Sequence, residues 1–64
     1  MEGNVKFYLE EKWYGFIKGE DYHDYFFHKT GLVDESVVLS ENDRVSFDIK
    51  EEDKGPRAVN IKKV

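Results

Sequence analysis

The chain of 64 residues contains no cysteine, one proline and no long apolar run. Without cysteine it can form neither a disulfide nor a thiolate metal site, which agrees with a reducing compartment, so the cytoplasm is the expected location. No apolar stretch approaches the roughly 20 residues that cross a bilayer, and the first residues do not resemble a secretory signal. We therefore expect a chain that is neither secreted by that route nor associated with a membrane.

The chain also lacks low-complexity tracts, internal repeats and linkers, so residues 1–64 are expected to form one domain. A chain of this length builds one modest core and has no room for a separate catalytic module. No Ser-His-Asp set, phosphate loop or carboxylate pair is evident, which makes an enzyme the least favoured class. His23 and His28 are five residues apart on a strand-like segment and face opposite sides, so we expect no metal and no cofactor.

The net charge of −4 argues at first against a nucleic-acid partner, because phosphate binding depends on basic groups. The charge is unevenly distributed. Residues 30–53 carry two bases and eight acids, whereas residues 54–64 carry four bases and no acid. If this basic tail folds beside the aromatic segments, the face that they share is neutral to positive, and it is this local potential that a ligand meets.

Aromatic residues are concentrated in one part of the chain: nine of the ten lie within the first 27 residues. A domain this small buries only about 60% of its surface, so several rings must stay near water. Exposed rings in a soluble protein usually mark a binding site. Rings set among Lys6, Lys12 and Lys29 suit a single-stranded nucleic acid, whose bases stack on rings and whose phosphates need positive charge.

Alternation of apolar and polar residues predicts five short strands, at residues 4–9, 14–18, 24–28, 45–50 and 57–62. The second and third strands are expected to form a hairpin, and the region 30–43 is rich in turn formers and is expected to be a long ordered loop. Val45, Phe47 and Ile49 are expected to face the core from the fourth strand, and Val59 and Ile61 from the fifth. Five strands without a convincing helix indicate an all-β protein with a small closed or nearly closed barrel.

Strand period assigns the side chains of the second and third strands to two faces. If Ile17 points inward, its neighbours on the other face point to solvent. Tyr25 and Phe27 are then expected in the core. The outward side chains form an expected platform of four rings: Tyr14, Phe16, Phe26 and His28.

Three positions beside this platform need separate treatment. Gly15 lies where the absence of a side chain lets a base or the neighbouring strand approach closely. Phe7 alternates with the core residues of its strand, and only a bend or bulge would turn it outward, yet we count it as a contact. Trp13 is either a ring lying in a solvent-exposed turn or an added stacking surface, and both alternatives stay open.

Two motifs resemble those of the cold-shock domain. Residues 12–17 are similar to its Lys-Gly-Phe-Gly-Phe-Ile motif, and residues 25–28 to its Val-Phe-Val-His motif, in the family's order and approximate spacing. Residues 55–61 resemble its closing Gly-Pro-Gln-Ala-Ala-Asn-Val, and the similarity extends over nearly the whole chain. The resemblance implies a five-stranded antiparallel OB-type barrel that binds single-stranded RNA or DNA, preferably pyrimidine-rich, and acts as an RNA chaperone; a monomer is expected.

Carried over position by position, the resemblance implies these nucleic-acid contacts: Lys6, Phe7, Lys12, Tyr14, Phe16, Asp24, Phe26, His28, Pro56 and Arg57. The residues themselves add Trp13, Lys29 and Lys54, which lie beside the same expected strand path. The chain departs from the family at Phe7, where Trp is usual, at Trp13, where Gly is usual, and at Lys29, where an aromatic is usual. The loop after the third strand also lacks an aromatic that bacterial members have, so we expect a divergent member with a shorter site.

The sequence leaves two hypotheses from different classes. In the first, the protein is a passive single-strand binder, with RNA and DNA equally open as ligands. In the alternative, the barrel is a protein-interaction module with weak or no nucleic-acid binding. The net charge, the aromatic lost at Lys29 and the enrichment of aromatics at protein interfaces motivate the alternative.

Overall fold

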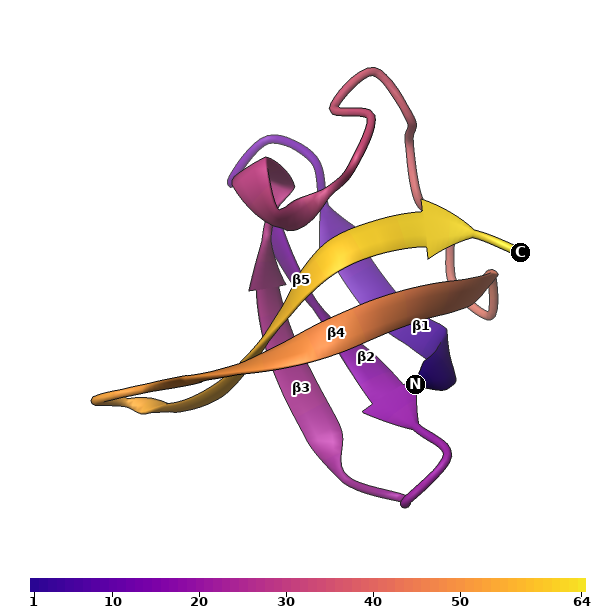
Figure 1. The fold of residues 1–64 in the computed structure, drawn as a ribbon. Helices are drawn as coiled ribbons and strands as arrows, with labels where there is room; N and C mark the ends of the chain where they lie inside the picture. Colours follow the sequence, from indigo (N-terminus) through magenta and orange to yellow (C-terminus); the bar gives the residue numbers. More distant parts are fainter.

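The computed structural model describes residues 1–64 as five strands and one turn of 3-10 helix (Figure 1). The hydrogen-bonded strand order β1-β2-β3-β5-β4 closes a barrel, and every neighbouring pair is antiparallel except β3 and β5, which meet in parallel. The all-β, five-stranded barrel predicted from the sequence is therefore confirmed. The elements are β1 (Glu2–Leu9), β2 (Tyr14–Gly19), β3 (Asp24–His28), η1 (Lys29–Gly31), β4 (Arg44–Glu52) and β5 (Gly55–Lys63).

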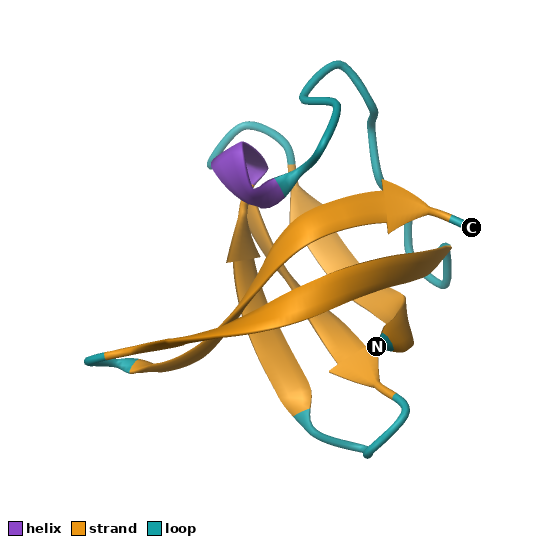
Figure 2. Cartoon of the chain, viewed as in Figure 1, coloured by secondary structure: helices purple, strands orange, loops and turns teal.

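Four of the five strands are longer than predicted. The β4–β5 ribbon in particular continues past the apolar residues through polar positions and extends away from the barrel (Figure 2). Its outermost pair is Glu52 opposite Gly55. Alternation detects only the part of a strand that buries one face, whereas backbone hydrogen bonds also pair polar residues. The predicted strands were therefore too short.

The core collects side chains from every strand and from the loop between η1 and β4. Leu32 pairs with Ile61 of β5 as an isolated bridge, so this loop contributes directly to the interior. Tyr25 and Phe27 are buried, as predicted. The ten buried apolar residues are Val5, Ile17, Tyr25, Phe27, Leu32, Leu39, Val45, Phe47, Ala58 and Ile61.

Two inward assignments were wrong. Ile49 is 38% exposed, and Val59 is only partly buried. The pairing of β4 with β5 shifts register between Ser46 and Asp48, and Asn60 has a φ of 53°, outside the strand region. Between these pairs β5 advances three residues where β4 advances two, so the extra residue belongs to β5 and reverses the expected inward position of Val59. Ile49 keeps its alternation with Phe47, but every residue of β4 from Asp48 onward is exposed, because the β4–β5 ribbon leaves the core there.

Candidate nucleic-acid interface

The outer face of β2 and β3 carries the predicted rings. Tyr14 lies opposite His28, and Phe16 lies opposite Phe26, in one continuous antiparallel register. The rings of Tyr14 and Phe26 stack at 5.9 Å between centroids, and Phe16 meets Phe26 edge-on at 5.8 Å. All four side chains are half-buried and present part of their surface to solvent.

Phe7 joins this face because of a bulge in β1. The register between β1 and β2 shifts between Val5 and Phe7, so Val5 is buried while Phe7 turns outward. Its ring lies 5.7 Å from that of Phe16 and 6.5 Å from that of Tyr14. The next residue, Tyr8, packs against the core instead. The condition that the sequence set for Phe7, a bulge, is therefore met. We use the name aromatic face for Phe7, Tyr14, Phe16, Phe26 and His28.

Gly15 is required by the barrel itself. A Cβ at this position would lie 2.2 Å from the backbone oxygen of Phe7 and 2.9 Å from the ring of Phe27. Both distances are shorter than van der Waals contact, so any side chain would push β1 away or displace the core ring. Of the two reasons considered from the sequence, the close approach of the neighbouring strand is the one that the structure shows.

The β4–β5 turn brings polar groups to the edge of the aromatic face. The guanidinium of Arg57 lies 5.6 Å from the ring centroid of Phe26, and its Nη1 donates to Glu52 Oε1 at 3.2 Å. Beside them is a pocket lined also by Lys54 and Pro56. Three predicted site residues, Lys54 of the turn and Pro56 and Arg57 at the start of β5, thus lie together beside Phe26.

Lys6 and Asp24, two further predicted contacts, pair with each other. Lys6 Nζ donates to Asp24 Oδ2 at 3.0 Å, and both side chains are nearly half exposed. Exposed ion pairs contribute only about 0.2–1 kcal/mol. The ammonium group can therefore leave the carboxylate for a phosphate at little cost in stability.

Trp13 directly precedes β2, and Lys29 directly follows β3. The Lys29 backbone N–H donates to the Trp13 backbone oxygen at 2.8 Å, and Lys29 Nζ lies 5.2 Å from the centroid of the indole. Trp13 is 53% exposed, and Lys12 in the same turn is exposed. At the neighbouring position, His28 Nδ1 accepts from the Thr30 N–H at 3.2 Å, which holds the imidazole in place at the end of the face.

None of the titratable groups with a shifted pKa belongs to the aromatic face. The hydroxyl of Tyr25 donates to the carboxylate of Asp21, which lowers the pKa of Asp21 and raises that of Tyr25. A hydrogen bond from the Ser36 hydroxyl lowers the pKa of Asp34, and one from the Ser40 N–H lowers that of Asp43. The structure contains no group of three or more His, Cys, Asp or Glu side chains that could hold a metal ion.

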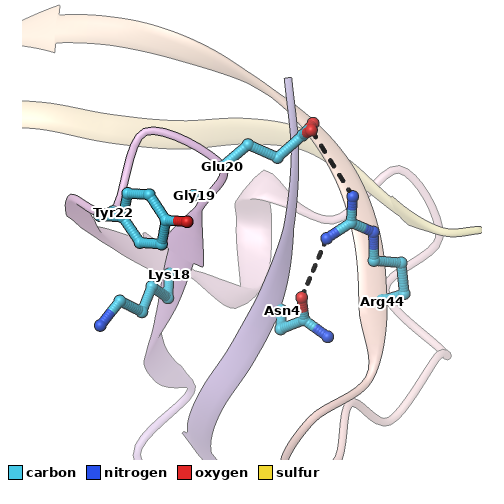
Figure 3. A pocket seen from close by; sticks show the side chains of 6 residues that line it. All are labelled: Asn4, Lys18, Gly19, Glu20, Tyr22 and Arg44. Atoms are coloured by element: carbon cyan, nitrogen blue, oxygen red, sulfur yellow. Dashed lines mark hydrogen bonds and ion pairs between the residues drawn. The ribbon is translucent and has the colours of Figure 1, made fainter.

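Sequence reasoning missed a polar pocket where β1, β2 and β4 meet (Figure 3). Arg44 Nη1 donates to Asn4 Oδ1 at 2.9 Å, and Arg44 Nη2 lies 3.8 Å from Glu20 Oε2. Lys18 and Tyr22 line the same pocket. These residues come from separate segments and share no local pattern, so no signal in the sequence points to them.

A family model described as the "'Cold-shock' DNA-binding domain" matches residues 1–64. The chain belongs to this family. It is 42% identical over 60 residues to Cold shock protein 1 of Lactiplantibacillus plantarum, covering 92% of this chain and 91% of that one. It is 40% identical over 65 residues to Cold shock-like protein CspB of Bacillus cereus, covering both chains fully.

A solved structure, Drosophila Unr CSD456, is similar to the cold-shock fold of this chain with a TM-score of 0.72 and 27% identity. The similarity covers 98% of this chain and 26% of that one, so this chain spans about a quarter of its length. Membership of the cold-shock family confirms the resemblance predicted from the two motifs and supports nucleic-acid binding as the class of function. None of the helical segments is long and apolar enough to cross a membrane.

Proposed function

We propose that this protein binds single-stranded RNA or DNA by stacking bases on the aromatic face, and that it acts as an RNA chaperone. The observation that carries the proposal is the clustering of five rings from three strands on the outside of the barrel. A duplex hides its base faces, whereas an unpaired strand offers them. Each stacked base contributes about 1–3 kcal/mol, so a few of these rings suffice for binding.

Basic groups around the face are assigned to the phosphates and base edges. Lys6 and Arg57 lie next to the rings, and each is paired with a carboxylate that a phosphate can replace. Lys12 and Lys54 are exposed in the flanking turns. Because few cations are involved, affinity falls only modestly with salt, by a slope of about −0.7 per phosphate neutralised.

The further details of the proposal follow from weak, distributed contacts. Stacking accepts any base, so the preference is modest and favours pyrimidine-rich strands, whose bases splay out easily. A protein that holds unpaired bases keeps RNA from pairing with itself, which is the chaperone action. We assign this to a cytoplasmic monomer in which residues 1–64 act as one domain, with no catalytic step and no cofactor.

Fluorescence anisotropy tests the proposal with labelled oligo(U), oligo(dT) and a duplex of equal length, at about 50 and 200 mM salt. The expected result is saturable binding of both single strands, weak binding of the duplex and a modest loss at the higher salt. Emission of Trp13, the only tryptophan, gives an independent signal. Equal affinity for duplex and single strand would contradict stacking on the aromatic face.

The alternative function, a protein-interaction module, is favoured by one observation. Two cations beside the aromatic face, Lys6 and Arg57, are neutralised by Asp24 and Glu52, and the whole chain carries a net charge of −4. This alternative predicts weak or no oligonucleotide binding even at about 50 mM salt, the lower of the two concentrations, at which electrostatic binding is stronger. The same titration therefore separates the two functions.

A further inference from the structure

The antiparallel pairing of β2 and β3 continues one position beyond the aromatic face. The last rung of the two strands is Tyr14 opposite His28, and the next residues along the chain are Trp13 and Lys29. Their backbones remain joined by the hydrogen bond from the Lys29 N–H to the Trp13 oxygen. Trp13, whose side chain is about half exposed, is therefore the first residue beyond the final pair of outward residues, Tyr14 and His28.

Trp13 adopts a backbone conformation that tryptophan rarely takes. Its φ is 62°, in the left-handed region, where a bulky side chain is a true outlier and glycine is at ease. The conformation is held by the surrounding turn, in which the Trp13 N–H donates to the Leu9 oxygen at 2.8 Å. Strained residues cluster at functional sites, but strain alone does not identify one, since Tyr22 has a similar φ of 66°. Folding alone would be better served by glycine here.

Charged groups of both signs lie near the indole of Trp13. Lys29 Nζ lies 5.2 Å from its centroid, within cation–π distance. Glu10 and Glu11 line the open pocket that Trp13 borders. A phosphate near this ring is thus attracted toward Lys29 and repelled from the glutamates. An indole ring with one neighbouring ammonium group provides what a nucleotide requires. The ring is a surface on which the base can stack, and the ammonium group is a cation for the phosphate.

We propose that Trp13 and Lys29 form an additional nucleotide position at the end of the aromatic face, in which the indole stacks on one base of a single strand and Lys29 contacts its phosphate. This inference rests on the proposed function and extends it by one nucleotide. The strand runs along the outer face of β2 and β3 and ends over the indole. Lys29 leaves the face of the ring when the base arrives and follows the phosphate.

Tyr22 provides a matched control within the same chain. It is an exposed aromatic (81%) with a φ of 66°, in the turn at the opposite end of the β2–β3 hairpin. It lines the polar pocket of Figure 3 and lies outside the aromatic face. Replacing either residue by glycine relieves the same backbone strain and removes an exposed ring. Only one of the two replacements removes a proposed stacking surface.

The experiment combines Trp13→Gly and Tyr22→Gly with labelled oligo(dT) strands of increasing length. Both variants are expected to raise the Tm, because glycine tolerates positive φ. Trp13→Gly weakens binding of the longer strands by about fivefold or more and leaves the shortest bound strand unaffected, as expected for the loss of one stacked base. Tyr22→Gly leaves all affinities unchanged. Trp13→Phe keeps a ring and retains most of the affinity.

Lys29→Gln tests the proposed phosphate contact. Removing one phosphate contact is expected to make the slope of log affinity against log salt shallower by about 0.7 for long strands only. An affinity of Trp13→Gly equal to that of the wild type at every length would overturn the inference, while loss of binding in Phe16→Ala and Phe26→Ala would still uphold the proposed function. If the wild-type protein binds no single strand, the proposed function fails first.

Discussion

The two faces of β3 differ in burial, although both carry aromatic residues. Tyr25, Phe26 and Phe27 are consecutive aromatics; the outer two are buried in the core, while the middle one lies half-exposed among the rings of the aromatic face. Residue type therefore does not separate a core ring from an outward ring. The side of the sheet does, because successive side chains of a strand point in opposite directions.

The two faces also differ in what surrounds their rings. Phe27 packs beneath Gly15 and stacks on Tyr8 at 5.5 Å, so it is enclosed on all sides. The ring of Phe26 stacks on Tyr14, meets Phe16 edge-on and has the guanidinium of Arg57 nearby, and it is still only half-buried. Removing an inward ring should thus damage the fold, whereas removing an outward ring should damage binding.

The largest effect is expected for Phe27→Ala. Deleting a fully buried phenylalanine costs about 3–5 kcal/mol, a large part of the stability of a domain of this size. Thermal and urea unfolding followed by circular dichroism should show a largely unfolded variant. Phe26→Ala, one residue away on the other face, is the control and should unfold cooperatively. Equal losses in both variants would mean that the faces do not differ as described.

Phe16→Ala and Phe26→Ala should reverse this pattern. Each removes a stacking surface worth about 1–3 kcal/mol, so the Kd for oligo(dT) rises about 5- to 150-fold. The free energy of unfolding falls less than for Phe27→Ala, because both rings are only half-buried. Isothermal titration of folded variants provides the measurement. Unchanged affinity in both would remove the aromatic face from the site.

Glu52→Gln should strengthen binding. The carboxylate of Glu52 neutralises Arg57 at the border of the aromatic face, at 3.2 Å. In the proposed complex it competes with phosphate for the guanidinium group. Exposed pairs of this kind are worth about 0.2–1 kcal/mol, so the expected gain is at most about fivefold, with a steeper dependence on salt. Glu41→Gln removes an exposed acid of the loop that forms no ion pair and serves as the control. A gain of equal size in the control would assign the effect to net charge alone.

The smallest effect concerns the stability of the fold in acid and involves Tyr25, one of the buried rings of β3. The hydroxyl of Tyr25 lowers the pKa of Asp21 in the folded protein, so this carboxylate stabilises the fold above its unfolded pKa of about 4. That contribution disappears as the pH falls through the lower, folded pKa. Tyr25→Phe should therefore lower the Tm at neutral pH and flatten its decline below about pH 4. A decline as steep as that of the wild type would separate Tyr25 from the titration of Asp21.

Alternation succeeded where strands are regular. β2 and β3 pair without interruption, so the period of two placed Ile17, Tyr25 and Phe27 in the core and the four outward rings on the other side. It failed for Val59, because the bulge in β5 changes the count of residues between inward positions, and for Ile49, because the β4–β5 ribbon leaves the core at that point. The motif resemblance led to the correct family for a separate reason, since it rests on residue identity and order and does not require each side chain to be oriented correctly.

The amino-acid sequence by itself determined the strand content, the hairpin of β2 and β3 and the division of its rings between two faces. Each of these depends on local spacing along one segment. Only the tertiary structure decided that Phe7 turns outward at a bulge, that Leu32 enters the core and that Arg57 lies against Phe26. These outcomes depend on closing the barrel, which joins residues far apart in the chain and therefore leaves no periodic signal in any one of them.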